Sequence, residues 1–169
     1  RLSQLGISKV SGLTVLVPDS GDYAEIFADI SQQWQKDLSV FFSVKALSND
    51  ALLAAVASGN YDIALLPLEQ SENDVYSLLA RFKTGKADNA PRFSNPPYDE
   101  MLREIEQTRD ARIRADLFVQ AEKYLLSQAP LVPLFYETDT FLYSADISGL
   151  VISPYGPVVD ISFAVKAGE

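Results

Sequence analysis

Ser58-Gly59-Asn60-Tyr61-Asp62-Ile63-Ala64-Leu65-Leu66-Pro67 is the segment that indicates the fold of this chain most clearly. Its first three residues are typical of a turn, because glycine and asparagine tolerate positive φ angles. The apolar run from Tyr61 to Leu66 is typical of a short strand covered on both faces, as in a parallel sheet beneath helices. Pro67 ends the run, since its nitrogen cannot donate to a sheet. The segment therefore predicts a buried parallel strand.

The surrounding sequence alternates predicted strands and helices. Upstream, the pattern predicts strands over residues 13–17 and 38–46 and helices over residues 23–37 and 50–58. Such alternation is typical of a parallel sheet with right-handed crossovers. Downstream, the pattern predicts three helices: one over residues 75–82 with Asp74 as its cap, one that begins at a cap formed by Asp99, and one over residues 111–128. Strands are predicted after them, over residues 131–135, 140–143 and 161–165.

The composition argues against several classes of function. The 169 residues carry a formal net charge of −9, which disfavours nucleic acid, whose phosphates need a basic surface. The chain has no histidine and no cysteine, so the most common metal ligand and general base are absent and thiol chemistry is excluded. It contains neither a glycine-rich phosphate loop nor an apolar run of about 18 residues. We therefore expect no catalytic residues, no metal, no cofactor and no membrane span.

Polar side chains follow the predicted strand directly. In open α/β sheets, ligands bind at the carboxyl ends of strands, so this loop is a candidate binding site. Its carboxylates could instead serve acid–base catalysis in a hydrolase, or they could simply solvate the loop. The loop consists of Glu69, Gln70, Ser71, Glu72, Asn73 and Asp74.

Several segments together resemble the solute-binding proteins of peptide-type ABC transporters, the oligopeptide-, dipeptide- and nickel-binding family. ALLAAVASGNYDIALLP (51–67) is similar to the family's helix, turn, Tyr-Asp pair and apolar strand. RDARIRADLFVQAEKYLLSQAPLVPLFY (109–136) is similar to its long helix and the Pro-x-Val-Pro segment after it. NPPYD (95–99) and DISGLVISPYG (146–156) resemble two shorter family motifs. The resemblance covers residues 13–163.

This resemblance implies an α/β fold: a single lobe of a type II periplasmic-binding-protein-like fold, with a mixed, mostly parallel sheet flanked by helices. Residues 1–12 would be a lead-in from an N-terminal lobe missing from this chain. Residues 13–150 would form the ligand-binding lobe, and residues 151–169 would return toward the hinge or the other lobe.

The implied function is non-catalytic binding of a peptide or similar small solute by an ABC importer. Two hinged lobes would close on the ligand, and extended peptides would be bound through main-chain hydrogen bonds. The expected partners are the ligand, the missing N-terminal lobe and a membrane permease. The full-length protein would be extracytoplasmic, in the periplasm or lipid-anchored on the outer face of the membrane.

The resemblance also implies which residues bind the ligand, and we expect these to lie near one another: Leu68, Glu69, Gln70, Ser71, Asn73 and Tyr136. Leu68 stands where the family usually has an aromatic residue. Ser71 stands where some members have an aspartate that pairs with the peptide ammonium, and Glu69 or Glu72 could supply that charge after a loop shift. Tyr61 and Asp62 are expected to be structural.

An alternative from a different class stays open at this point. The effector domain of a cytosolic transcriptional regulator can share the two-lobed α/β architecture. The long helix over residues 111–128, followed by Pro-x-Val-Pro, argues against it.

Overall fold

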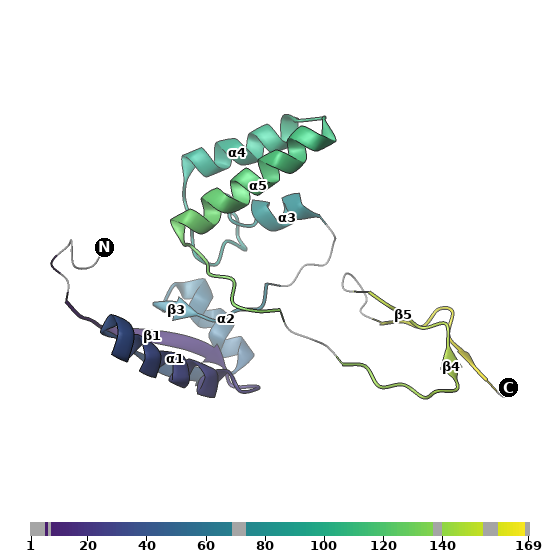
Figure 1. Ribbon diagram of the computed structural model, residues 1–169, viewed down its shortest axis with the longest axis horizontal. Coiled ribbons are helices and arrows are strands. Elements are labelled where there is room, and N and C mark those ends of the chain that lie inside the picture. Colours follow the sequence, from purple (N-terminus) through teal and green to yellow (C-terminus); the bar gives the residue numbers. More distant parts are fainter. Residues whose placement is uncertain (1–5, 7, 69–73, 137–139, 154–158, 168–169) are drawn as a thin grey trace. The chain divides into compact units, whose positions relative to one another are not determined.

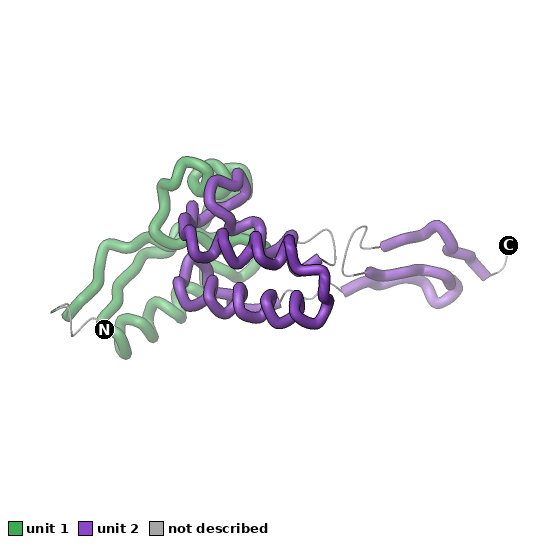
Figure 2. Tube along the Cα trace, turned by 90° about the horizontal axis from the view of Figure 1, so that it is seen from above, with its two compact units in different colours: residues 1–68 green, residues 69–169 purple. Residues whose placement is uncertain are grey.

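Figure 1 shows the computed structural model of the chain, in which residues 6, 8–68, 74–136, 140–153 and 159–167 are described. The chain divides into two compact units, Arg1–Leu68 and Glu69–Glu169, which Figure 2 distinguishes by colour. The division falls at the start of the polar loop that follows the strand predicted over residues 61–66. The predicted boundaries of a ligand-binding lobe, residues 13–150, stay a prediction.

The first unit alternates strands and helices in chain order. Its elements are β1 (Val10–Pro18), α1 (Tyr23–Leu38), β2 (Val40–Leu47), α2 (Asn49–Ser58) and β3 (Ile63–Ala64). β1 lies between β2 and β3, and both pairings are parallel. The predicted α/β fold with a parallel sheet is therefore confirmed.

The central strand β1 carries the core of this unit on both of its faces. Val15 and Val17 are buried and pack with Phe27 of α1. Because side chains alternate along a strand, Leu16 points to the opposite face, where α2 contacts β1. Leu16 and Leu52 of α2 are also buried. The near-continuous apolar sequence of β1 thus reflects a strand buried on both sides.

The turn that precedes β3 follows from the residues predicted for it. Gly59 ends α2 with a left-handed backbone (φ 73°), which glycine adopts without strain. The amide of Asn60 donates to the carbonyl of Ala55 at 2.9 Å, which closes the last helical turn. β3 itself is shorter than the predicted run from Tyr61 to Leu66, although the amide of Leu65 still donates to the carbonyl of Leu16 at 2.8 Å.

The second unit contains a cluster of three helices. These are α3 (Val75–Ala80), α4 (Pro96–Gln107) and α5 (Ala111–Gln128). Their apolar faces meet in one core, whose buried members are Leu79, Phe82, Tyr98, Leu102, Ile105, Ala121 and Leu125. The hydroxyl of Tyr98, at the centre of this core, donates to the carbonyl of Leu79 at 2.9 Å, which links the α3 and α4 segments.

The predicted cap of α4 is wrong. Asn95 caps this helix, and its side chain accepts from the amide of Tyr98 at 3.1 Å. Two prolines follow Asn95 in the first turn, where their missing N–H groups cost nothing. Asp99 lies inside the helix instead, and its carboxylate accepts from the amide of Thr84 at 3.0 Å.

The last part of the second unit consists of short antiparallel pairs. β4 (Ile147–Ser148) pairs with β7 (Val165–Lys166), and β5 (Val151–Ile152) pairs with β6 (Val159–Asp160). The predicted strands over residues 131–135 and 140–143 do not form in the described residues, and only the end of the predicted strand 161–165 does. A strand needs a neighbour for its hydrogen bonds, and apolar residues alone do not provide one.

Candidate functional site

The carboxyl edge of the parallel sheet is the place where this fold can present a ligand-binding loop. In the sheet, β2 lies on one side of β1 and β3 lies on the other. The chain therefore passes from β1 to β2 on one side and then crosses to β3 on the other, so the direction of the connections reverses at β1. Ligands of open α/β sheets bind in the crevice at such a reversal, outside the carboxyl ends of the strands. The loop over residues 19–22 follows β1 there, and Pro67 and Leu68 follow β3.

The opposite end of β3 has a structural role. The carboxylate of Asp62 accepts a hydrogen bond from the amide of Thr14 at 2.8 Å, so it links the start of β3 to β1. Asp62 precedes the strand, whereas the candidate loop follows it. This geometry agrees with the structural role expected for Asp62.

The structure describes two of the six predicted site residues. Leu68, at the end of the first unit, has 48% of its surface exposed, and Tyr136, in the second unit, is 100% exposed. Both side chains are therefore accessible to solvent. Glu69, Gln70, Ser71 and Asn73 lie outside the described residues, as does Glu72. The proximity of the six residues thus stays a prediction.

The described chain resumes at Asp74 with a helix cap, as predicted. Its carboxylate oxygens accept from the amides of Tyr76 at 3.1 Å and Ser77 at 3.0 Å. These are the amides that the first turn of α3 leaves without helical partners. One carboxylate of the polar loop is therefore committed to helix capping.

Shifted pKa values in the described residues have structural causes. Burial, the hydrogen bond to Glu106 and the nearby negative charge together raise the pKa of Tyr76 to about 12, and burial contributes most. Burial, followed by the charge of Asp99, also raises the pKa of Tyr98. Both tyrosines thus keep their protons, and each hydroxyl joins α4 to the α3 segment.

The described ranges contain neither a candidate metal site nor a candidate membrane-spanning helix. No group of three or more acidic side chains there is arranged to hold a metal ion. None of the helices in that part of the chain has the length and apolar character needed to cross a bilayer.

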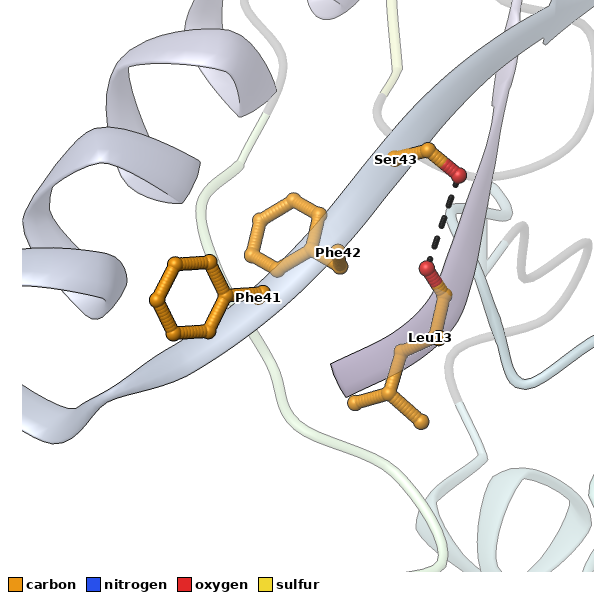
Figure 3. A pocket seen from close by; sticks show the side chains of 5 residues that line it. Leu13, Phe41, Phe42 and Ser43 are labelled. Atoms are coloured by element: carbon orange, nitrogen blue, oxygen red, sulfur yellow. Dashed lines mark hydrogen bonds between the residues drawn. The ribbon is translucent and has the colours of Figure 1, made fainter. Parts of the chain in front are cut away.

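Two surface depressions in the described part of the chain are large enough to note, and neither is lined by Leu68 or Tyr136. The first, of about 270 Å³, is an open depression at the amino end of β1 and β2 (Figure 3). Gly12, Leu13, Phe41, Phe42 and Ser43 line it. The hydroxyl of Ser43 donates to the carbonyl of Leu13 at 3.5 Å, at the limit of a hydrogen bond.

The second cavity, of about 170 Å³, belongs to the loop that joins α3 to α4. Sequence reasoning missed it, although the loop has a recognisable signal, since it concentrates cationic residues in an acidic chain. The lining residues are Gly85, Lys86, Asn89, Arg92, Phe93 and Ser94.

Comparison with known proteins finds similarity to solute-binding proteins. No protein-family model matches it. Dipeptide-binding protein DppE of Bacillus subtilis is 23% identical over 94% of this chain and 29% of its own length. The probable deoxycholate-binding periplasmic protein YgiS of Escherichia coli is 29% identical over 82% of this chain and 26% of its own length. The chain thus spans well under a third of either relative.

The solved structures agree on the fold. The substrate-binding domain of an oligopeptide ABC transporter from Bacillus anthracis superposes with a TM-score of 0.82, at 23% sequence identity. The match covers 98% of this chain and 32% of that one. The resemblance to peptide-type solute-binding proteins is therefore confirmed. The alternative of a regulator's effector domain finds no support among these relatives.

Proposed function

We propose that this relative of the peptide-type solute-binding proteins is a ligand-binding part of the substrate-binding component of an ABC importer. The observation that carries the proposal is the similarity to a dipeptide-binding protein over 94% of the chain. The ligand is a peptide or a similar small solute. The wider class is included because another relative is named for deoxycholate. The protein binds and does not catalyse.

The same proposal includes the setting of the protein. Several relatives are described as periplasmic, which supports an extracytoplasmic location, with a lipid anchor as the alternative to a free periplasmic form. The partners are the ligand, an N-terminal lobe and a membrane permease. Residues 13–150 form the lobe that contacts ligand.

The proposed ligand-binding residues are those at the end of β3 and in the loop after it, together with Tyr136. The exposure of Leu68 and Tyr136 supports this assignment, because an apolar contact surface for a ligand must be open in the free protein. Ser71 cannot form an ion pair with a peptide ammonium. Glu69 or Glu72 supplies that charge if the ligand is bound by a free amine.

The ligand class is tested by mass spectrometry of solutes released when the natural protein that contains this chain is denatured. We expect peptides or solutes of similar size, recovered in proportion to the protein. A protein that releases no solute on denaturation and, after correct refolding, binds no peptide would contradict the proposal.

The amine contact is tested with a bound tripeptide and its N-acetyl form. If Glu69 or Glu72 binds the ammonium, acetylation weakens binding by about tenfold or more, because a charge-assisted hydrogen bond is lost. Glu69→Gln and Glu72→Gln identify which carboxylate is responsible. Equal affinity for the two peptides would rule out an amine-binding carboxylate and leave the rest of the proposal standing.

A further inference from the structure

The strand β3 has a short ladder for the element that leads to the candidate ligand-binding loop. In the described part of the chain, its pairing with β1 covers Ile63 and Ala64, whereas β2 pairs with β1 over residues 40–47. Past the end of β3, the amide of Leu65 donates to the carbonyl of Leu16 at 2.8 Å. A strand with so short a ladder depends on other contacts for its register along β1.

The apolar side chains of β3 restrict this register only in part. Ile63 and Leu65 pack against the core of the first unit, together with Val15 and Val17. A shift by one residue would turn both side chains away from the core and is therefore disfavoured. A shift by two residues keeps the same face toward the core, because side chains alternate along a strand.

The two directions of a two-residue shift differ. A backward shift would bring Pro67 to the place of Leu65, where an amide has to donate to Leu16, and proline has no N–H group. A forward shift would bring Tyr61 to the place of Ile63, and no proline opposes it. It would move Leu68 by roughly 7 Å, at about 3.3 Å per residue. The register therefore needs a contact that opposes the forward shift.

The carboxylate of Asp62 makes this contact. Its Oδ2 atom accepts from the amide of Thr14 at 2.8 Å. Thr14 lies two residues before Leu16, so its amide points to the same edge of β1, toward β3. The carboxylate thus stands where a main-chain carbonyl would stand in a longer ladder, and a charged acceptor strengthens the hydrogen bond. A forward shift would carry Asp62 past Thr14 and break this bond.

We propose that Asp62 is a positioning residue for ligand binding: its hydrogen bond to Thr14 fixes the register of β3, and with it the position of Leu68 at the carboxyl edge of the sheet. The inference rests on the proposed function, because it takes Leu68 to contact the ligand. Asp62 precedes β3 and Leu68 follows it, so Asp62 acts through the strand and does not contact the ligand itself.

The first test is hydrogen–deuterium exchange of the natural protein that contains this chain, followed by mass spectrometry. Asp62→Ala removes the acceptor, whereas Asp62→Asn keeps a side-chain oxygen that can accept from Thr14. We expect exchange over residues 61–68 to become about fivefold faster in Asp62→Ala, because one hydrogen bond is lost. It should return close to the original rate in Asp62→Asn. Residues 49–58 of α2 should exchange equally in all three proteins.

The second test is the affinity of the same proteins for a mixture of short peptides, measured well below the unfolding temperature. All of the protein is then folded, so a loss of stability alone does not change the affinity. We expect Asp62→Ala to bind about fivefold more weakly and Asp62→Asn to bind nearly as well as the unaltered protein. Ser31→Ala is the control. It removes the hydrogen bond from the Ser31 hydroxyl to the carbonyl of Phe42, at 3.2 Å between α1 and β2, and should leave the affinity unchanged.

The outcomes separate this inference from the proposed function. Unchanged exchange over residues 61–68 in Asp62→Ala would overturn the inference. An unchanged affinity in that variant, or an equal loss in Ser31→Ala, would do the same. An unaltered protein that binds no peptide would overturn the proposed function instead, and the exchange rates alone would then decide whether Asp62 fixes the register of β3.

Discussion

At the scale of single residues, the clearest prediction concerns the side chain of Asn89. This buried side chain satisfies two carbonyls and one amide of the loop between α3 and α4. Asn89→Ala leaves these groups without partners, and we expect a loss of about 2–3 kcal/mol in the free energy of unfolding. Urea denaturation measures it. The matched control is Asn60→Ala, at an exposed position, for which we expect a change below about 0.5 kcal/mol. Equal effects of the two substitutions would contradict the assigned role.

Gly149 tests a close approach of two backbone segments. Its φ angle is +76°, and a Cβ atom there would lie 2.0 Å from the carbonyl oxygen of Phe163. Gly149→Ala therefore forces the β4–β7 pair apart, and its amides should lose their protection from hydrogen exchange. Gly85→Ala is the control, because Gly85 has a similar φ of +80° with no atom within 4 Å of the added Cβ. If both variants keep the β4–β7 amides protected, the close approach is wrong.

At the scale of elements, the contacts between α3 and α4 predict a dependence on alkaline pH. The pKa of Tyr76 rises from 10.0 to about 12 on folding, and burial also raises the pKa of Tyr98. The folded state thus holds these protons more tightly than the unfolded state. Stability is fully present below pH 10 and is lost as the pH rises from 10 toward 12. Urea denaturation across this range measures it. Tyr76→Phe and Tyr98→Phe should each reduce the slope, and an unchanged slope in both would contradict this assignment.

The long helix α5 tests the contribution of a single cap. The carboxylate of Asp110 accepts from the amides of Arg112 at 2.9 Å and Ile113 at 3.0 Å. Asp110→Ala should cost about 1 kcal/mol in the free energy of unfolding, because both amides lose their partner. Asp116→Ala, an exposed substitution inside the same helix, should have little effect. The account of the cap fails if the two variants have the same stability.

The elements also show which features were predictable from sequence. Gly59 and Asp74 act within a few residues of their own positions, so the turn before β3 and the start of α3 were predictable. The cap of α4 was also within reach, since Asn95 precedes two prolines and Asp99 does not. The strands predicted after α5 depend on neighbours that the apolar pattern cannot specify.

At the scale of the whole molecule, the sequence predicts the fold better than it predicts the binding site. The parallel sheet follows from local alternation, and the family resemblance agrees with the relatives found. The cavity at Lys86 and Arg92 was missed, because it depends on the backbone that Asn89 imposes across the loop. The positions of Leu68 and Tyr136 relative to each other stay a prediction for the same reason, since distant segments have to meet.

The most direct measurement is the unfolding temperature of the natural protein that contains this chain, titrated with a mixture of short peptides. The protein is first unfolded and refolded to remove bound solute. The account predicts a saturable rise, since a ligand at about a hundred times its dissociation constant stabilises the folded state by about 2.7 kcal/mol. A correctly refolded protein whose unfolding temperature does not change at any peptide concentration would contradict the proposed peptide-binding function.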